Sequence, residues 1–167
     1  MTERINSRFD SPVEKRFYQD GKVGATAGWT VRAADDTWMS TCAASATAGT
    51  LVMPLPGLKE GDVIHGFHLL GQIESAGNTA TLDCALYEFV PAAAASAAAA
   101  LSGASMTQVS VTADTKLDDG NTKKTLDATN RIVVRRDRTY FALLTATTAA
   151  STDIELLGLM LHVDPQR

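Results

Sequence analysis

The chain of 167 residues contains only two cysteines, Cys42 and Cys84. A small secreted domain held together by disulfides would carry more cysteines in a shorter chain, so a disulfide scaffold is excluded. Cys84 falls at an inward position of the alternating segment 82–86. We therefore expect a buried free thiol there, which behaves as a small apolar group; a reactive or bridged thiol is the alternative.

Long hydrophobic runs and an excess of basic residues are also missing. No run reaches the roughly 18 apolar residues of a membrane span, and the N-terminus has no apolar segment of signal-peptide length. We therefore expect a protein made in the cytoplasm, with no membrane partner. The net charge is −4, with 15 Lys and Arg against 19 Asp and Glu. Nucleic-acid binding relies on a basic surface, so no nucleic-acid partner is expected.

The motifs of common enzyme classes are absent as well. The sequence has no nucleophile elbow, phosphate-binding loop, zinc-protease helix or dinucleotide-binding turn. His65 and His68 are three residues apart on an expected strand and should point to opposite faces, which argues against a shared metal. The acidic residues around Gly120 lack the order of a calcium-binding loop. We therefore predict no catalytic residue, no metal site and no cofactor.

What the sequence does contain is strand periodicity. From Gly28 onward apolar and polar residues alternate with a period of two, and polar turns separate the alternating segments at short spacing. About eight such segments predict an all-β fold, namely an antiparallel, jelly-roll-like β-sandwich. The length fits one such domain over residues 29–167, preceded by an N-terminal arm over residues 1–28. The expected strands are 29–34, 51–55, 63–73, 79–90, 106–113, 131–135, 139–147 and 153–163.

The arm, residues 1–28, carries interleaved charges and too few apolar side chains to fold by itself. Two interpretations remain open: a frayed terminus, or an extended segment that orders against a partner. The aromatic residues within it favour the second. The candidate docking residues are Arg4, Arg8, Phe9, Arg16, Phe17 and Tyr18.

The alanine-rich segment 91–103 breaks the alternation. Alanine has the highest helix propensity, Pro91 suits the first turn of a helix, and Gly103 suits its C-terminal cap. The segment predicts a short helix that is stable only when packed on the sandwich or a neighbour. An extended linker is the alternative.

The last expected strand, 153–163, is apolar on both faces, whereas a sheet with one solvated face should alternate with polar residues. The second face should therefore be covered, by the alanine-rich segment or by another subunit. Symmetric oligomers bury such surplus apolar surface, which favours the subunit. The candidate interface residues are Leu157, Leu159 and Leu161.

Two further clusters have alternative interpretations. The basic turn 135–138 is typical of a charged hairpin tip, and the alternative is an anion-binding site. Trp29, Trp38 and Tyr87 are aromatic residues on which a sugar ring can stack. Packing in the core is the favoured use of the two tryptophans.

The segment Leu55–Phe67 combines a proline, the pair Gly61 and Asp62, and a strand, and the segment Gly71–Leu86 continues it as a long hairpin. These segments resemble jelly-roll proteins of tailed-phage particles, over about residues 50–163. The resemblance implies a structural virion protein of the capsid decoration (cement) or head-fibre type. It implies attachment to the lattice of the major capsid protein, commonly as a homotrimer. Because enzyme motifs are absent, we expect no enzymatic activity. The alternative is a carbohydrate- or receptor-binding β-sandwich of a phage fibre or baseplate.

Overall fold

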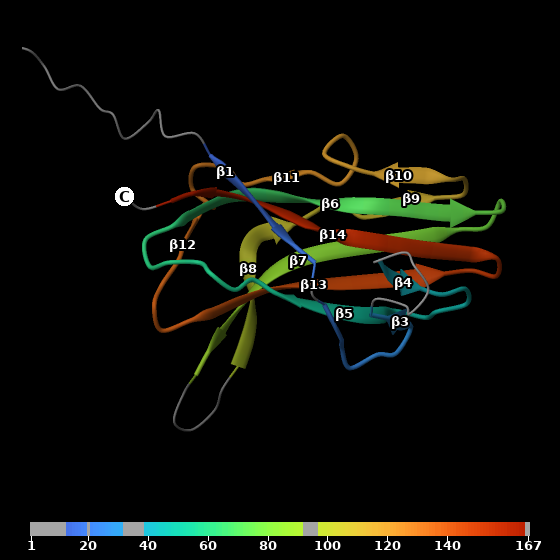
Figure 1. The fold of residues 1–167 in the computed structure, drawn as a ribbon, viewed down its shortest axis with the longest axis horizontal. Helices are drawn as coiled ribbons and strands as arrows, with labels where there is room; N and C mark the ends of the chain where they lie inside the picture. The colour runs from blue at the N-terminus through green and yellow to red at the C-terminus, as the bar shows by residue number, and fades with distance from the viewer. Residues whose placement is uncertain (1–12, 20, 32–38, 92–96, 166–167) are drawn as a thin grey trace, which may run out of the picture.

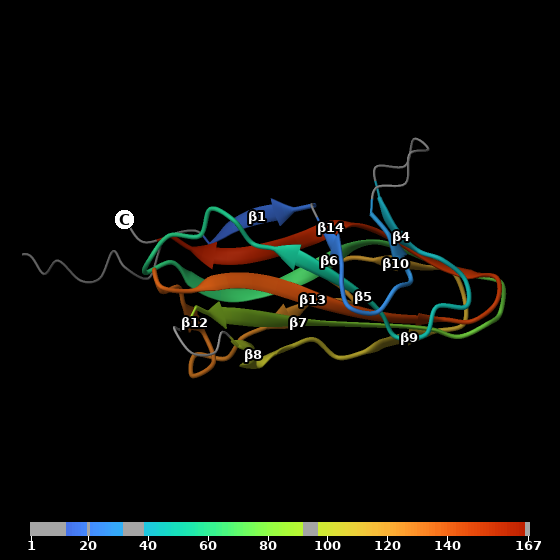
Figure 2. The same cartoon turned by 90° about the horizontal axis from the view of Figure 1, so that it is seen from below.

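The computed structural model describes residues 13–19, 21–31, 39–91 and 97–165 (Figure 1). Over these ranges the protein is all-β and consists of two antiparallel sheets, seen edge-on as two layers in Figure 2. The predicted antiparallel β-sandwich is therefore confirmed. Among the described residues, no helix is long and apolar enough to cross a membrane.

The larger sheet is built on two long strands, β6 (Val63–Ser75) and β14 (Thr152–Asp164), which pair antiparallel along most of their length. The edge of β14 that does not pair with β6 pairs with two short strands, β1 and β4, and β4 pairs in turn with β3. The edge of β6 that does not pair with β14 pairs with three short strands, β10, β11 and β12. The short strands of this sheet are β1 (Glu14–Tyr18), β3 (Trp29–Thr30), β4 (Ser40–Cys42), β10 (Thr115–Leu117), β11 (Lys124–Thr125) and β12 (Ile132–Val133).

The smaller sheet is centred on β13 (Thr139–Thr148), which pairs with β7 (Ala80–Val90) on one side and β5 (Gly49–Pro54) on the other. Its edges are β2 (Lys22–Val23) beyond β5, and β8 (Ala97–Ser105) and β9 (Val109–Val111) beyond β7. Burial alternates along these strands, as the period-two sequence pattern predicts. The two sheets thus enclose one hydrophobic core.

The expectation that the last strand is apolar on both faces is wrong, because β14 contains a bulge. Its register against β6 shifts between Leu156 and Gly158, so Leu157 has no partner. An extra residue reverses the in–out alternation of everything that follows. Leu159 and Leu161 consequently face the same core as Leu156, and neither has exposed surface.

The alanine-rich segment forms a strand over its described part, so the predicted helix is wrong for residues 97–103. Ala98, Ala99 and Ala100 pair with Phe89, Glu88 and Tyr87 of β7. A short alanine helix is marginal by itself, whereas pairing with β7 gives the backbone hydrogen-bond partners along an existing sheet edge. The extended alternative therefore describes this part better. Residues 92–96 lie outside the described ranges.

The described residues of the predicted arm belong to the sandwich. β1 pairs antiparallel with β14, and β2 pairs with β5, so the chain crosses from one sheet to the other between them. In Figure 2, β1 lies above β14, on the side of the larger sheet that faces away from the smaller sheet. The segment is extended, as predicted, but it is ordered against its own domain.

Candidate functional site

Two adjoining pockets open at the end of the sandwich where β12 leads through the basic turn into β13. The first, of about 280 Å³, is lined by the segment 55–60 and by the turn with Tyr140. The second, of about 470 Å³, lies between the turn, β8 and the segment 129–133. Arg135 and Arg138 line both. The second is called the polar pocket below; its lining residues are Glu88, Leu101, Ser102, Thr129, Asn130, Arg131, Ile132, Val133, Arg135 and Arg138.

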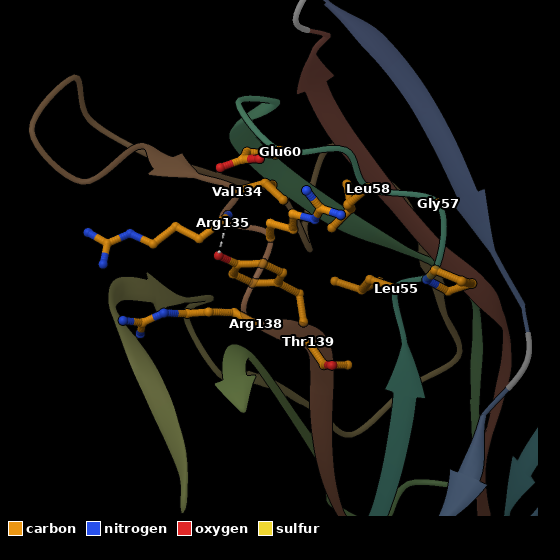
Figure 3. A pocket seen from close by; sticks show the side chains of 11 residues that line it. Leu55, Gly57, Leu58, Glu60, Val134, Arg135, Arg138 and Thr139 are labelled. Carbon is orange, nitrogen blue, oxygen red and sulfur yellow. Dashed lines mark hydrogen bonds between the residues drawn. The ribbon is translucent and has the colours of Figure 1, made fainter. Parts of the chain in front are cut away.

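Backbone hydrogen bonds fix the basic turn at the mouth of these pockets. The N–H of Arg135 donates to the Tyr140 hydroxyl at 3.0 Å, the dashed line in Figure 3, and Tyr140 itself is buried. One residue earlier, the N–H of Val134 donates to the carbonyl of Asp62 at 2.8 Å. The turn is thus tied both to β13 and to the segment that precedes β6.

The arginines of this end differ in their partners. Arg138 forms an ion pair with Glu88 of β7, and both side chains are about four-fifths buried (20% and 19% exposed). Arg131 and Arg135 are exposed, and neither has an ion-pair partner among the described residues. In Figure 3 the side chains of Arg135 and Arg138 run in the same direction, away from Leu55 and Gly57. Unpaired positive charge therefore collects here, in a chain whose net charge is −4.

The opposite wall of the polar pocket is formed where β8 touches the segment before β12. Gly103 has a φ of +69°, and a Cβ atom there would lie 3.0 Å from the Asn130 amide. The N–H of Asn130 donates to the Asp127 carbonyl at 2.8 Å, which closes a turn. Ser102, Thr129 and Asn130 thus place two hydroxyls and an amide beside the arginines. Such groups donate and accept hydrogen bonds without charge.

The candidate docking residues divide between the inside and the outside of β1. Arg16 pairs with Asp62, and Tyr18 is buried, with its phenol pKa raised by desolvation. Phe17 between them is 44% exposed and lies opposite Met160 of β14. Arg4, Arg8 and Phe9 lie outside the described residues. The structure therefore leaves Phe17, among the described candidates, as the aromatic group free to meet a partner.

Of the candidate interface residues, only Leu157 is exposed, at 38% of its surface. Leu159 and Leu161 are packed inside the protomer and offer no surface to a second subunit. Leu157 lies next to Gly158, over which the ring of Phe17 packs: a Cβ at Gly158 would come within 2.6 Å of Phe17 Cε2. Phe17, Leu157 and Met160 are called the β1 surface below.

A histidine pair that the sequence did not suggest lies on the outer face of the larger sheet. His68 Nδ1 is 3.0 Å from His162 Nε2, and the rings meet edge to face. Desolvation by burial, followed by repulsion from His68, lowers the pKa of His162 to about 4. The two residues are 94 positions apart, so only the pairing of β6 with β14 reveals the contact. Within the described ranges, no three His, Cys, Asp or Glu side chains form a metal-binding group.

Trp29, Tyr87 and the two cysteines all lie in the smaller or larger sheet. Trp29 is buried and its indole N–H donates to the Gly49 carbonyl at 3.1 Å, which confirms core packing for this residue. Trp38 lies outside the described ranges. Tyr87 stacks on Phe141, with ring centroids 5.4 Å apart. Both cysteines are free and buried, which confirms the predicted buried thiol at Cys84.

These features define a two-sheet antiparallel β-sandwich with a polar, arginine-lined pocket at one end and an exposed apolar surface over β1. Comparisons of the chain with protein-family models, with curated proteins and with solved structures found no match. The polar pocket and the β1 surface are therefore the two candidate functional surfaces of the described residues.

Proposed function

We propose that this chain is a structural virion protein, a capsid decoration protein that binds and stabilises the head lattice of a tailed phage. The observation that carries the proposal is the β1 surface, where Phe17 and Leu157 are both exposed and the ring of Phe17 packs over Gly158, the chain neighbour of Leu157. Clustered apolar groups on a protein surface mark sites of protein–protein contact. The resemblance of residues 50–163 to phage jelly-roll proteins supplies the identity of the partner, the major capsid protein lattice.

The mechanism is mass action. A protein that binds the assembled lattice and not its free subunits stabilises the lattice by RT ln(1 + [L]/Kd), about 2.7 kcal/mol per site at a concentration of 100 Kd. If the chain is a homotrimer, as the resemblance implies, several β1 surfaces engage neighbouring lattice sites and gain avidity without new contacts. Sedimentation velocity of the purified chain tests this part: a mass of one subunit at micromolar concentration contradicts the trimer.

The test of attachment uses exposed residues, so that the fold is preserved. Heads of the phage that encodes the chain, prepared without it, are incubated with the wild type or with Phe17→Ser/Leu157→Ser, and bound protein is measured after sedimentation. We expect occupancy to fall at least tenfold. The matched control is Val133→Ser on β12. It removes an apolar side chain that is more exposed (56%) than Phe17 or Leu157 and that lines the polar pocket instead of the β1 surface. Unchanged occupancy of the double variant would contradict lattice binding through β1.

A second candidate function, a glycan- or receptor-binding sandwich of a fibre or baseplate, is favoured by a different observation. The polar pocket has the size of a small-ligand site and combines hydroxyl, amide and guanidinium groups. A glycan array probed with the labelled chain tests it, and an array without hits removes it. Because Trp29 is buried, a sugar platform built on that residue does not support this candidate.

A further inference from the structure

We propose that the polar pocket binds an acidic saccharide, with the carboxylate or sulfate group on Arg131 and Arg135 and the sugar hydroxyls on Ser102, Thr129 and Asn130. The inference deepens the second candidate function and rests on it. It does not depend on lattice attachment, because the pocket and the β1 surface are built from different residues.

The charge of the lining selects an anion. Three arginines and one carboxylate line the pocket, and the carboxylate, Glu88, is already paired with Arg138. This leaves Arg131 and Arg135 to neutralise a ligand. A guanidinium group presents a rigid fork of N–H donors that matches the two oxygens of a carboxylate or sulfate.

The neutral groups of the lining select a saccharide. Ser102, Thr129 and Asn130 offer donors and acceptors together, which suits hydroxyl groups that are themselves both. Val133, 56% exposed, adds an apolar surface for the C–H face of a sugar ring. Aromatic residues are absent from the described lining, so a nucleobase would lack the stacking partner that such ligands use.

The site is also preorganised. Tyr140 holds the backbone of Arg135, and the contact between Gly103 and Asn130 fixes the opposite wall. Groups that are held in place before binding lose less conformational freedom when a ligand arrives. The backbone on two sides of the pocket is therefore held in place before a ligand arrives.

The inference is tested by NMR titration of the ¹⁵N-labelled full chain. The probes are a glucuronate-containing oligosaccharide, a sulfated oligosaccharide, the uncharged counterpart of each, and oligoglutamate of equal charge. We expect at least one acidic saccharide to bind with shifts centred on residues 101–103 and 129–135, and its uncharged counterpart to bind at least tenfold more weakly. Arg135→Gln and Asn130→Ala should each weaken binding about tenfold. Arg136→Gln is the matched control, since this arginine of the same turn lines only the other pocket.

The outcomes separate this inference from the function on which it rests. Equal binding of a charged probe and its uncharged counterpart overturns acid recognition but leaves glycan binding standing. Equal binding of oligoglutamate, with no effect of Asn130→Ala, shows a site that responds to charge alone and overturns both. Absence of binding by every probe overturns the inference, and a glycan array without hits then removes the second candidate function as well.

Discussion

Arg16 and Asp62 form an ion pair, with Arg16 Nη1 2.9 Å from Asp62 Oδ2, that fastens β1 to the segment preceding β6. The Asp62 side chain has no exposed surface and also accepts a hydrogen bond from the N–H of Lys59 at 3.0 Å. A buried carboxylate requires such partners, because removal from water is costly for an unpaired charge. The pair adds to the pairing of β1 with β14 in holding this segment on the domain.

Replacing Arg16 by glutamine should therefore destabilise the protein by about 2–3 kcal/mol, since the buried carboxylate of Asp62 would lose its charge-assisted hydrogen bond from Arg16. Urea unfolding followed by circular dichroism measures the change. The matched control is Lys116→Gln, which removes an exposed lysine 3.7 Å from Asp118 and should cost less than about 0.5 kcal/mol. Equal effects of the two substitutions would show that the Arg16–Asp62 pair does not anchor β1.

Gly158→Ala should loosen β1 from β14. An added Cβ would press against the Tyr18 carbonyl and lie 2.6 Å from the ring of Phe17, so the strand must shift. We expect a loss of about 1–3 kcal/mol and faster hydrogen exchange at the amides of residues 14–18. Gly77→Ala strains a turn with a φ of +86° but meets no atom within 4 Å. In this control, hydrogen exchange at the β1 amides should not change. Slowed or unaltered exchange in Gly158→Ala would contradict the close packing of β1 on Gly158.

The histidine pair predicts an acid-sensitive stability. The pKa of His162 is about 4 in the folded protein, below its ordinary value of 6.5, so the unfolded chain binds more protons between these values. The stability contribution is fully present above pH 6.5 and declines as the pH falls toward 4. Thermal melts from pH 7.5 to 4.5 should show a falling Tm, and the fall should be smaller in His162→Gln. An identical pH profile in that variant would show that other groups cause the loss.

The two thiols should be inert in the native state. Burial raises the pKa of Cys42 to about 11 and that of Cys84 further, and both side chains are almost completely inaccessible. Thiolate is the reactive species, so neither should react with a disulfide reagent at pH 8 until the protein unfolds. Titration of thiols with and without guanidinium chloride measures this. Rapid labelling of one thiol per chain without denaturant would contradict the burial.

The long strands could be predicted from the sequence because their signal is local. In β13, for instance, Tyr140, Ala142 and Leu144 alternate with exposed or half-buried residues, and burial follows that pattern. The polar stretch 114–124, which shows no such alternation, is different. Thr122 is buried there, and its hydroxyl accepts a hydrogen bond from the N–H of Leu69 at 2.9 Å and lies 2.6 Å from the carbonyl of Asp118, to which it can donate. A threonine in a polar stretch gives no local sign that its side chain will bind the backbone of a distant strand such as β6.

The sequence by itself determined the class of fold, since period-two alternation between polar turns leaves two packed sheets as the way to bury one face of every strand. It also determined that Cys84 is an internal residue. Tertiary structure decided which surfaces remain available. Because Leu157 of β14 has no partner in β6, the side chains of Leu159 and Leu161 point into the core. Pairing with β7 makes the described part of the alanine-rich segment a strand. The polar pocket likewise depends on contacts between β8, the segment before β12 and the basic turn. Such contacts join residues far apart in the chain, and a local pattern carries no information about them.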